Sequence, residues 1–459
     1  MGGLSFKALN MSSALISMVY GRARFRDVAF PSISMEISMN RVLFRNAQVW
    51  DATGAPSFPA DVLVEGGRIE TIARTPGELA AEGAVVIEAN GRTLMPGLVE
   101  GHAHISFGGA INDSDLGNIP PEEHVLLTMR NAKTLLDHGF TSAYSAATSK
   151  LRLDVVIRNE VNAGRLPGPR IRAASPEITV TGGLGDERKQ HMYYESFGMI
   201  ADGPEEIARA VRLCCREGVD NIKVNISGDD LSPAADGGFT VMREAEVQMA
   251  VNVARDFGKK VNCHARAAES VKRAVRCGVD VIYHCESADE EALDMLESVK
   301  DRIFVGPAIG IIYGTLYEGE KYGFYRDSDL GRTMQRVIDT TAAVYSELRR
   351  RGVRILIGGD YGFAQSPQGD NARDLKHFVD LLGFSPTEAL QCGTRIGGQV
   401  MGLGGELGEV REGYIADLLL VKGDPLKDLD LVVHEKNLHV IMKDGVLYKN
   451  QAIAETRQS

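Results

Sequence analysis

Short apolar runs typical of β-strands alternate with helical patterns through the middle of the chain. The runs occupy residues 142–146, 170–174, 219–226, 260–264, 279–284, 302–306 and 354–359, and one further run ends at residue 104. Between them, apolar positions recur with helical spacing, for example over residues 204–217, 244–257 and 270–277. Strands that alternate with helices in this way predict an α/β fold, a (β/α)8 TIM-like barrel, whose active sites lie at the carboxyl ends of the strands.

Both ends of the chain show a different pattern. Short strands joined by glycine-containing turns are predicted over residues 41–49, 61–65 and 68–72, and again over 413–421 and 440–447. Two separated β segments form one sheet only if the chain between them leaves and returns. We therefore expect a small β-sandwich domain built from residues 39–95 and 405–459, with a barrel of residues 96–404 inserted in it.

The residues before this domain, 1–38, are predicted to form a poorly ordered extension. Their apolar run, residues 14–20, is short, and Arg22, Arg24 and Arg26 follow it, whereas a secretory signal has its basic residues first. No run approaches the roughly 20 apolar residues of a membrane-spanning helix. We expect no membrane partner.

Composition and charge narrow the class of protein. The chain is 44% hydrophobic, enough for a large core, and its net charge of −11 comes without a basic stripe, which disfavours nucleic acid as a partner. Its six cysteines follow no disulfide or zinc-knuckle spacing. We expect a cytoplasmic enzyme, homo-oligomeric, that acts on a small molecule.

Side chains that bind metals lie at the ends of several predicted strands. His102 and His104 are spaced by one residue, so in a strand they point to the same face and can bind one ion as neutral imidazoles. Such a pair can also be a polar surface pair, but His264, His284 and Asp360 close later strands in the same way. Because strand ends meet at one rim of a barrel, the recurrence predicts a metal centre.

Lys223 lies in the predicted fourth strand, within a β-branched run. Burial disfavours a charged amine, and an uncharged lysine can react with carbon dioxide to give a carbamate, a bidentate anion able to bridge two cations. The alternative is a structural lysine paired with a carboxylate. Lys223 is therefore a candidate bridging ligand, with the ion pair left open.

These residue types indicate a hydrolase. Two divalent ions can share a hydroxide, and Asp360 can take its proton and deliver it to a departing nitrogen, which predicts hydrolysis of a C–N bond. Zinc is the expected metal. Cobalt and manganese stay open because histidine, carboxylate and carbamate suit all three metals.

The order Pro-Gly-x-x-x-x-His-x-His, strand-four Lys, His, His, Asp resembles that of the amidohydrolase superfamily, and residues 164–170, 385–390 and 413–418 support the resemblance, which runs from about residue 41 to residue 449. Within it, the chain is similar to the branch near imidazolonepropionase, the Xaa-Pro dipeptidases and the molinate and phenylurea hydrolases. The resemblance implies the following ligand sets: His102, His104 and Asp360 for the more buried ion, His264 and His284 for the more exposed ion, and carboxylated Lys223 as the bridge. It also implies that Lys223 argues against deamination.

Three positions depart from the family pattern. Arg266 stands where the peptidase-like members carry tyrosine, Glu100 and Gly101 replace the usual aspartate before His-x-His, and Gln368 stands where a histidine is expected. Arg266 is a candidate catalytic or substrate-binding residue, able to bind a substrate carboxylate or donate to a neutral carbonyl. An ion pair with an acid such as Glu286 is the alternative, so substrate choice stays open.

Aromatic residues gather after the predicted seventh strand, among them Tyr313 and Tyr317. Placed above the metals, they would favour a flat apolar or aryl substrate, and an oligomer contact is the competing interpretation. His191, in the loop after the third strand, is a further candidate for substrate contact.

The sequence therefore predicts a binuclear metal-dependent hydrolase that cleaves an aryl urea, carbamate or anilide. A Xaa-Pro or other hydrophobic dipeptidase or carboxypeptidase is the rival enzyme. A non-catalytic assembly protein is a remote alternative, since such relatives usually lose ligands that this chain retains.

Overall fold

The computed structural model describes residues 41–194, 196–232 and 235–451. The extension predicted for residues 1–38 lies outside this described part, as do residues 452–459. The domain boundaries of the sequence analysis stay predictions.

The predicted (β/α)8 fold class is confirmed. Two parallel sheets form the barrel wall, one with the order β6-β7-β8 and one with the order β10-β9-β11-β12-β13-β14. The strands are β6 (Leu98–Ala103), β7 (Phe140–Ser145), β8 (Arg170–Arg172), β9 (Ala174–Thr179), β10 (Met199–Ile200), β11 (Asn221–Asn225), β12 (Lys260–Ala267), β13 (Val281–Ser287) and β14 (Phe304–Gly306). The predicted third strand is divided at Ala173 into β8, which pairs with β7, and β9, which pairs with β11.

The predicted eighth strand differs from the others. Residues 354–357 make a single bridge, between Ile355 and Val305 of β14, in place of a regular ladder. Backbone hydrogen bonds still hold the segment on both sides, from Leu356 to Val305 (2.8 Å) and from Gly101 of β6 to Ile357 (3.1 Å). A Cβ at Gly101 would lie 2.6 Å from the Ile357 carbonyl oxygen, so this closure requires a glycine.

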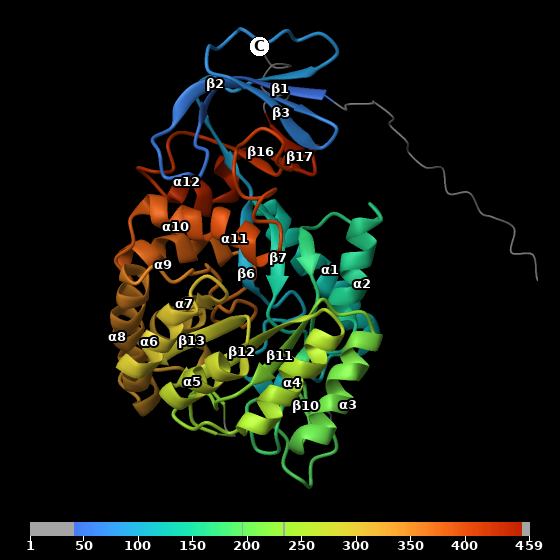
Figure 1. Ribbon diagram of the computed structural model, residues 1–459, viewed down its shortest axis with the longest axis vertical. Helices are drawn as coiled ribbons and strands as arrows, with labels where there is room; N and C mark the ends of the chain where they lie inside the picture. The colour runs from blue at the N-terminus through green and yellow to red at the C-terminus, as the bar shows by residue number, and fades with distance from the viewer. Residues whose placement is uncertain (1–40, 195, 233–234, 452–459) are drawn as a thin grey trace, which may run out of the picture. The chain divides into compact units, whose positions relative to one another are not determined.

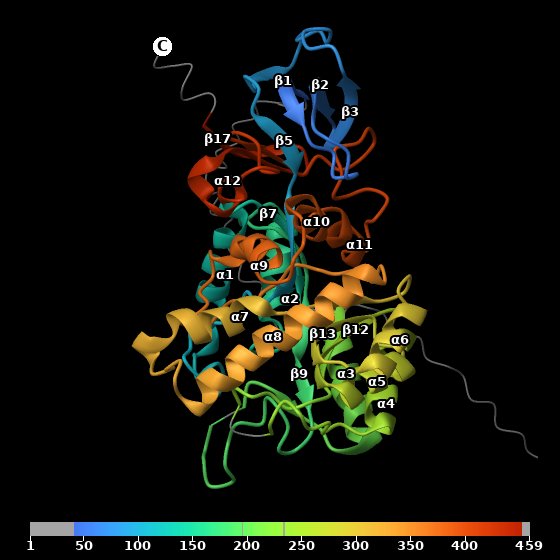
Figure 2. The same ribbon diagram turned by 90° about the vertical axis from the view of Figure 1, so that its left-hand side faces the viewer.

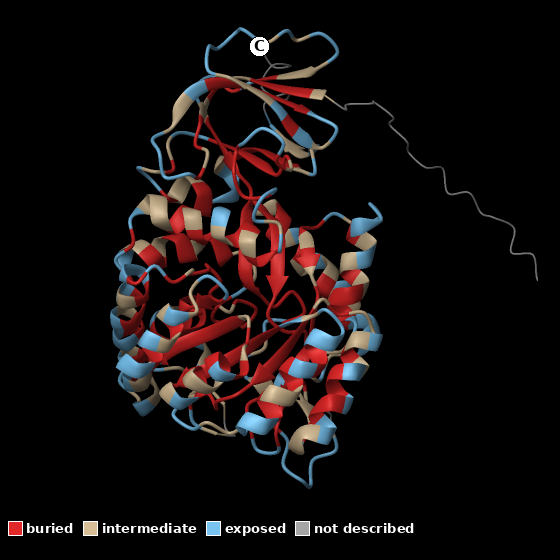
Figure 3. Cartoon of the chain, in the orientation of Figure 1, coloured by how far each residue is buried: buried red, intermediate tan, exposed pale blue. Residues whose placement is uncertain are grey.

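Helices surround the barrel strands, as Figures 1 and 2 show. The longer ones are α1 (Pro121–Asp137), α2 (Leu153–Asn162), α3 (Gly203–Arg216), α4 (Glu244–Asp256), α5 (Ala268–Cys277), α6 (Glu290–Ser298) and α8 (Asp329–Arg350). In α3, Ile207, Val211 and Cys214 are buried at helical spacing, which explains why this stretch forms an amphipathic helix. Figure 3 shows the same division in the barrel, with buried strands and with helices exposed on their outer faces.

Short helices fill the loops at the strand ends and the last third of the chain. They are η1 (Asp113–Asp115), α7 (Ile309–Tyr313), η2 (Gly314–Glu318), η3 (Glu320–Tyr322), η4 (Asn371–Arg373), α9 (Asp374–Asp380), α10 (Pro386–Cys392), α11 (Arg395–Val400), α12 (Asp430–Val433) and η5 (Glu435–Asn437). Ser385 caps α10 by accepting a hydrogen bond from the Glu388 amide, and Pro386 follows it, a typical helix start.

Two separated segments of the described chain, residues 41–96 and 418–450, form one sheet of eight strands, β1 (Arg41–Val49), β2 (Phe58–Glu65), β3 (Arg68–Ala73), β4 (Val85–Glu88), β5 (Thr93–Pro96), β15 (Leu418–Val421), β16 (Leu438–Lys443) and β17 (Val446–Asn450). The antiparallel pair β5–β15 joins the early and late segments. The sheet also turns back on itself, because Ile69 of β3 donates to the Tyr414 carbonyl (2.9 Å) and Ala416 donates to that of Gly67 (2.9 Å). A separate apolar core results, which includes Phe44, Leu418 and Val440.

A partly buried ion pair connects this sheet to the barrel. The Arg170 Nη1 atom of β8 lies 2.7 Å from an Asp417 carboxylate oxygen, next to β15.

Among the described helices, none combines the length and the apolar character that a membrane span requires.

Candidate metal centre

The structure brings the six residues predicted as metal ligands to the carboxyl ends of the barrel strands. They are His102 in β6, His104 just after it, Lys223 in β11, His264 in β12, His284 in β13 and Asp360 after the closing segment. The tightest group is His102, His104 and Asp360, each of which has a ligand atom within 4.8 Å of the others. His104 Nε2 lies 3.0 Å from Asp360 Oδ1, and His102 Nε2 lies 3.8 Å from the same oxygen.

A second histidine pair adjoins this group. The ring centroids of His264 and His284 are 4.1 Å apart, and those of His102 and His284 are 5.7 Å apart. The four imidazoles and Asp360 therefore form one continuous cluster of possible ligands.

Lys223 lies in the same site and is buried. Its Nζ atom lies 3.9 Å from Glu177 Oε1 and 5.3 Å from the centre of the Tyr283 ring. Glu177 is held in turn by Asn225, which donates from Nδ2 to Glu177 Oε2 (2.5 Å). The ion pair left open in the sequence analysis is thus present for the unmodified lysine.

Unpaired ring nitrogens are the feature that fits a metal. Both ring nitrogens of His102 and both of His284 are buried and accept or donate no hydrogen bond within the described part of the chain. A buried polar atom without a partner costs free energy, and a divalent ion would supply the missing partner for neutral imidazole. The donor set of histidines and a carboxylate therefore fits such an ion.

The charge states of these side chains also suit metal binding. Burial lowers the pKa of His264 to about 3 and lowers those of His102 and His284 well below their ordinary value. Burial alone would raise the pKa of Asp360, but His102 and His104 outweigh it and hold that pKa below its ordinary value. At neutral pH the imidazoles of His102, His264 and His284 are therefore uncharged and the Asp360 carboxylate is ionised, the forms that bind metal ions.

The backbone is strained where it presents these ligands. His284 has a φ of 79° and Asp360 a φ of 63°, in the left-handed region that such residues rarely adopt. Nearby Gly358 has a φ of 147°, and a Cβ there would lie 2.5 Å from the His102 side chain. Local strain of this kind concentrates at functional sites, where the surrounding structure enforces it.

Carbonyl oxygens fix the orientation of two of the imidazoles. His104 donates from Nδ1 to the Ala147 carbonyl (3.0 Å), and His264 donates from Nε2 to the Gly228 carbonyl (2.9 Å). Since a carbonyl oxygen only accepts, each contact leaves the other ring nitrogen as the lone-pair donor. Outer contacts of this type hold metal ligands in position.

Two of the departures from the family pattern lie behind the ligands. Glu100 is fully buried and accepts a hydrogen bond from Asn371 Nδ2 (2.9 Å), and burial together with Asp374 raises its pKa to about 8. Gln368 donates from Nε2 to the backbone carbonyl of His104 (2.9 Å). Both residues hold the backbone of the His102–His104 segment, because Glu100 also accepts a hydrogen bond from the His102 amide (3.0 Å).

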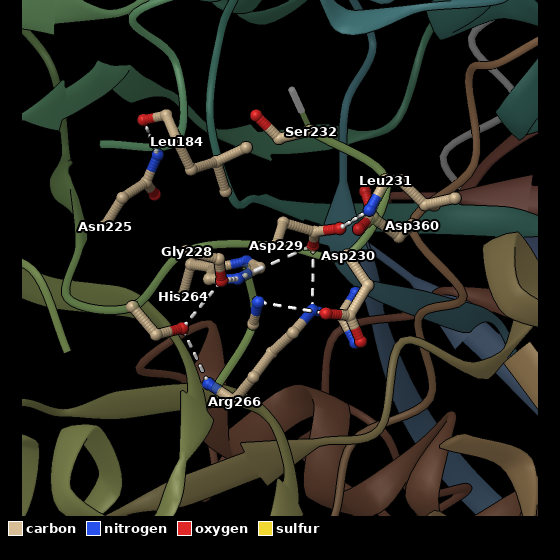
Figure 4. A network of polar contacts seen from close by, with 12 residues as sticks. Leu184, Asn225, Gly228, Asp229, Asp230, Leu231, Ser232, His264, Arg266 and Asp360 are labelled. Carbon is tan, nitrogen blue, oxygen red and sulfur yellow. Dashed lines mark hydrogen bonds and ion pairs between the residues drawn. The ribbon is translucent and has the colours of Figure 1, made fainter. Parts of the chain in front are cut away.

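Arg266, the third departure, is buried between two carboxylates. Its Nε atom lies 2.8 Å from Asp229 Oδ2 and its Nη1 atom 2.7 Å from Glu286 Oε1. Figure 4 shows Arg266 beside Asp229 and His264. The pair with Glu286 is the alternative that the sequence analysis left open.

A cavity of about 40 Å³ lies in front of these residues. Sequence reasoning missed its apolar wall, made by Phe107, Phe197, Phe363, Leu184, Leu231 and Ile311. Phe107 stacks on His104 with 4.0 Å between ring centroids, and it makes edge contacts with Phe197 and Phe363. The available signal was spacing, because Phe107 and Phe363 each lie three positions after a predicted ligand.

Three predicted substrate residues do not line this cavity. Tyr313 stacks on Tyr317 (4.7 Å between centroids) and on His377 (4.5 Å), and it faces a separate groove. His191 is exposed in the loop between β9 and β10. The aromatic contacts near the ligands therefore come from phenylalanines on other loops.

Comparison with known proteins agrees with this geometry. The amidohydrolase family model matches residues 93–448. The chain belongs to the amidohydrolase family. It is a hydrolase that acts on carbon–nitrogen bonds, as the sequence analysis predicted.

Individual amidohydrolases are similar over most of their length. Ochratoxinase of Aspergillus niger is 28% identical over 382 residues, which cover 78% of this chain and 76% of that protein. A Xaa-Pro dipeptidase solved with bound methionine is 26% identical, with a TM-score of 0.78 and coverage of 89% and 100%. A prolidase complexed with N-methylphosphonate-L-proline is 25% identical, with a TM-score of 0.80 and coverage of 90% and 100%. Imidazolonepropionase is similar in sequence, and molinate and phenylurea hydrolases share the fold, so the predicted branch is confirmed.

Proposed function

We propose that this amidohydrolase cleaves the C–N bond of a neutral, apolar amide-like substrate, an aryl urea, carbamate or anilide. The observation that carries the proposal is the cavity wall of Phe107, Phe197 and Phe363 beside the ligand cluster. Aromatic walls bind flat apolar groups through dispersion and edge contacts. The three phenylalanines, and not Tyr313 and Tyr317 as expected from the sequence, form the aromatic wall that would contact an aryl group.

The charges around the cavity favour a substrate without a free carboxylate. Arg266 is already paired with two carboxylates, one of which, that of Asp229, lines the cavity together with the carboxylate of Glu177. A substrate carboxylate would meet like charges there and find its best cation already paired.

We propose that His102, His104 and Asp360 hold one divalent ion and that His264 and His284 hold a second. Zinc is the preferred ion on this donor set, with cobalt and manganese as alternatives. When bound, such ions lower the pKa of coordinated water and polarise a substrate carbonyl. The unpaired ring nitrogens of His102 and His284 support the assignment.

Lys223 is proposed as the bridging ligand in its carbamate form. Its burial and its place in β11 beside the histidine cluster support this assignment. Conversion to a carbamate would replace the ion pair with Glu177 by two neighbouring anions, so the carbamate is expected only together with divalent cations.

Asp360 is proposed as the proton carrier. Its carboxylate stays ionised at neutral pH and lies against the two histidines of the first group, so it can accept a proton from the attacking water. The protonated carboxyl can then donate to the departing nitrogen, which leaves as a neutral amine. Phe107, Phe197 and Phe363 would hold the aryl group and keep bulk water out.

A hydrophobic dipeptidase is the second candidate. It is favoured by the similarity to a Xaa-Pro dipeptidase and a prolidase. Such a substrate carries a free α-carboxylate, which separates the two candidates experimentally.

The test compares kcat/KM for an anilide and an N-aryl urea with kcat/KM for Xaa-Pro dipeptides on protein reconstituted with zinc. We expect the neutral aryl substrates to be preferred, and Phe197→Leu to lower kcat/KM on them roughly tenfold, because part of the aryl contact is lost. Phe384→Leu is the matched control, since Phe384 and Phe197 are both 5% exposed and only Phe197 lines the cavity. Higher kcat/KM on dipeptides would establish the peptidase instead.

A further inference from the structure

A buried chain of three charged side chains runs beside His264. Asp229 Oδ2 contacts Arg266 Nε (2.8 Å), and Arg266 Nη1 contacts Glu286 Oε1 (2.7 Å). The exposed fractions of Asp229, Arg266 and Glu286 are 7%, 2% and 4%. Figure 4 shows the Asp229 end of this chain next to the imidazole of His264.

The Arg266 guanidinium is paired on both sides within the protein. Two carboxylates face one guanidinium, so the group as a whole carries one negative charge, and a buried ion pair of this kind is costly to break. The Arg266 guanidinium is therefore already engaged by Asp229 and Glu286. A carboxylate from a ligand would approach a group that is already negative.

Asp229 places the loop that contacts the imidazole. Gly228, whose carbonyl accepts from His264 Nε2 (2.9 Å), directly precedes Asp229, and Asp229 Oδ2 lies 3.6 Å from the same nitrogen. Asp229 Oδ1 accepts from the Leu231 amide (2.7 Å), which holds the next turn of the loop. The position of the Gly228 carbonyl thus depends on the position of the Asp229 side chain.

Arg266 holds both sides of this contact. Its backbone amide donates to Ser227 Oγ (2.9 Å), one residue before Gly228, while its side chain holds Asp229, one residue after it. Arg266 also lies two positions from His264 on β12. The loop and the strand are therefore joined on either side of the Gly228 carbonyl.

We propose that Arg266 is a positioning residue: through Asp229 it keeps the Gly228 carbonyl on His264 Nε2, so that the proton stays on Nε2 and Nδ1 remains the free donor for a metal ion. The role in metal binding rests on the proposed function, whereas the tautomer of His264 does not. Arg266 is, on this proposal, no anchor for a substrate carboxylate.

The experiment uses the full chain labelled with ¹⁵N-histidine and measures two properties. Nitrogen–carbon-proton correlation spectra of the metal-free protein report the tautomer of His264, identified by its absence from His264→Asn. Zinc titration against a competing chelator then reports the affinities of the stronger and weaker ions. Arg266→Met, Arg266→Lys and Asp229→Asn are compared with wild type.

Arg276→Met is the matched control. Arg276 also joins two carboxylates, those of Glu244 and Glu269, but it lies on the helical surface with its side chain 37% exposed. Removing it deletes the same type of ion pair away from His264.

In the wild type we expect the Nε2–H tautomer of His264. Arg266→Met and Asp229→Asn are expected to give a mixture of tautomers and to weaken the second zinc ion about 10- to 100-fold, with the first unchanged. Arg266→Lys should restore most of the Nε2–H form, because a cation again holds Asp229. Arg276→Met should match wild type in both measurements.

Unchanged tautomer populations in Arg266→Met and Asp229→Asn would overturn the proposal, whatever the zinc affinity. If Arg266→Met does not fold, the near-isosteric Asp229→Asn decides alone. A selective rise of KM for dipeptides in Arg266→Met, with the tautomer unchanged, would identify a carboxylate anchor. Failure of the wild type to bind zinc would refute the proposed function, and the tautomer comparison would still decide the role of Arg266.

Discussion

Two hollows of this molecule contain histidines and carboxylates, and they differ in how those side chains are paired. The groove between α9 and α12 has a volume of about 740 Å³ and includes His138 and His377. There, His377 Nδ1 lies 3.3 Å from Asp374 and His138 Nδ1 lies 2.9 Å from the Thr134 carbonyl. The cavity at the barrel mouth is far smaller, about 40 Å³, yet the ligand cluster beside it includes His102 and His284, whose ring nitrogens make no hydrogen bond within the described residues.

The difference shows which property indicates chemistry. Paired polar groups in an open groove are already satisfied, and exposed ion pairs there contribute little free energy. Buried ring nitrogens without partners are costly unless a ligand completes them. Buried ring nitrogens without hydrogen-bond partners therefore indicate the candidate reactive site better than the volume of a cavity does.

The sharpest test of this comparison exchanges one carboxylate in each hollow. Asp360→Asn should lower kcat about 10³-fold, because general acid–base groups typically contribute 10²- to 10⁴-fold, and metal content should be largely kept since an oxygen ligand remains. Asp430→Asn, which removes the partner of Lys376 in the groove, should change kcat less than about twofold. Steady-state rates and metal analysis measure both, and an unchanged kcat in Asp360→Asn would refute the proton-carrier role.

The second test exchanges one lysine in each hollow. Lys223→Ala should lower the metal content and reduce turnover about 10²-fold or more, because the bridging ligand is lost. Lys376→Ala in the groove should keep metal content and rate. Two zinc ions per chain and a near-native rate in Lys223→Ala would show that Lys223 is only the partner of Glu177.

A smaller effect is expected in the pH dependence of stability of the metal-free protein. The pKa of His264 is lowered from 6.5 to about 3 by burial, so below pH 6.5 the unfolded chain binds a proton that the folded chain does not. The stabilisation is complete above pH 6.5 and is lost progressively as the pH falls toward 3. Since His102 and His284 shift in the same direction, each adds to the loss.

Urea unfolding at pH 7, 6 and 5 measures this dependence. His284→Asn should reduce the slope by about 1.4 kcal/mol per pH unit, the value for one proton. Equal stability of the metal-free wild type at pH 7 and pH 5 would contradict the assignment of buried neutral histidines. Asp360 does not contribute in this range, since its pKa lies below 3.8 and its stabilisation is lost only at lower pH.

The barrel, and the meeting of the six candidate ligands at one rim, could be predicted from the sequence because both depend on local periodicity. His102 and His104 alternate with apolar residues, and His264 and His284 close runs that read clearly as strands, so the strand ends and their rim could be inferred. Residues 354–357 were harder, because their apolar pattern predicts a ladder while the structure makes only one bridge there. An apolar pattern indicates that a segment is buried. The number of backbone hydrogen bonds that the segment makes depends instead on the geometry of the neighbouring strands.

Loop side chains could not be placed from the sequence. Tyr313 and Tyr317 lie on two consecutive short helices, α7 and η2, and the direction of these helices decides which hollow the tyrosines face. Glu286 was a natural partner for Arg266 because β12 and β13 are adjacent, whereas Asp229 comes from a loop whose path no periodicity describes. Phe197 belongs to the same class, since its contact with Phe107 joins two loops.

The barrel closes where residues 354–357 meet β6, and this has a consequence for the synthesis of the enzyme. His102 and His104 emerge early from the ribosome, but their carboxylate neighbour lies just beyond the last segment of the barrel wall. During most of translation the nascent chain therefore contains His102 and His104 without Asp360. The group of three is complete only when residues 354–360 have been made and have closed the barrel. On the proposed assignment, binding of the first ion is therefore tied to the closure of the barrel, and a chain truncated before Asp360 lacks the carboxylate ligand.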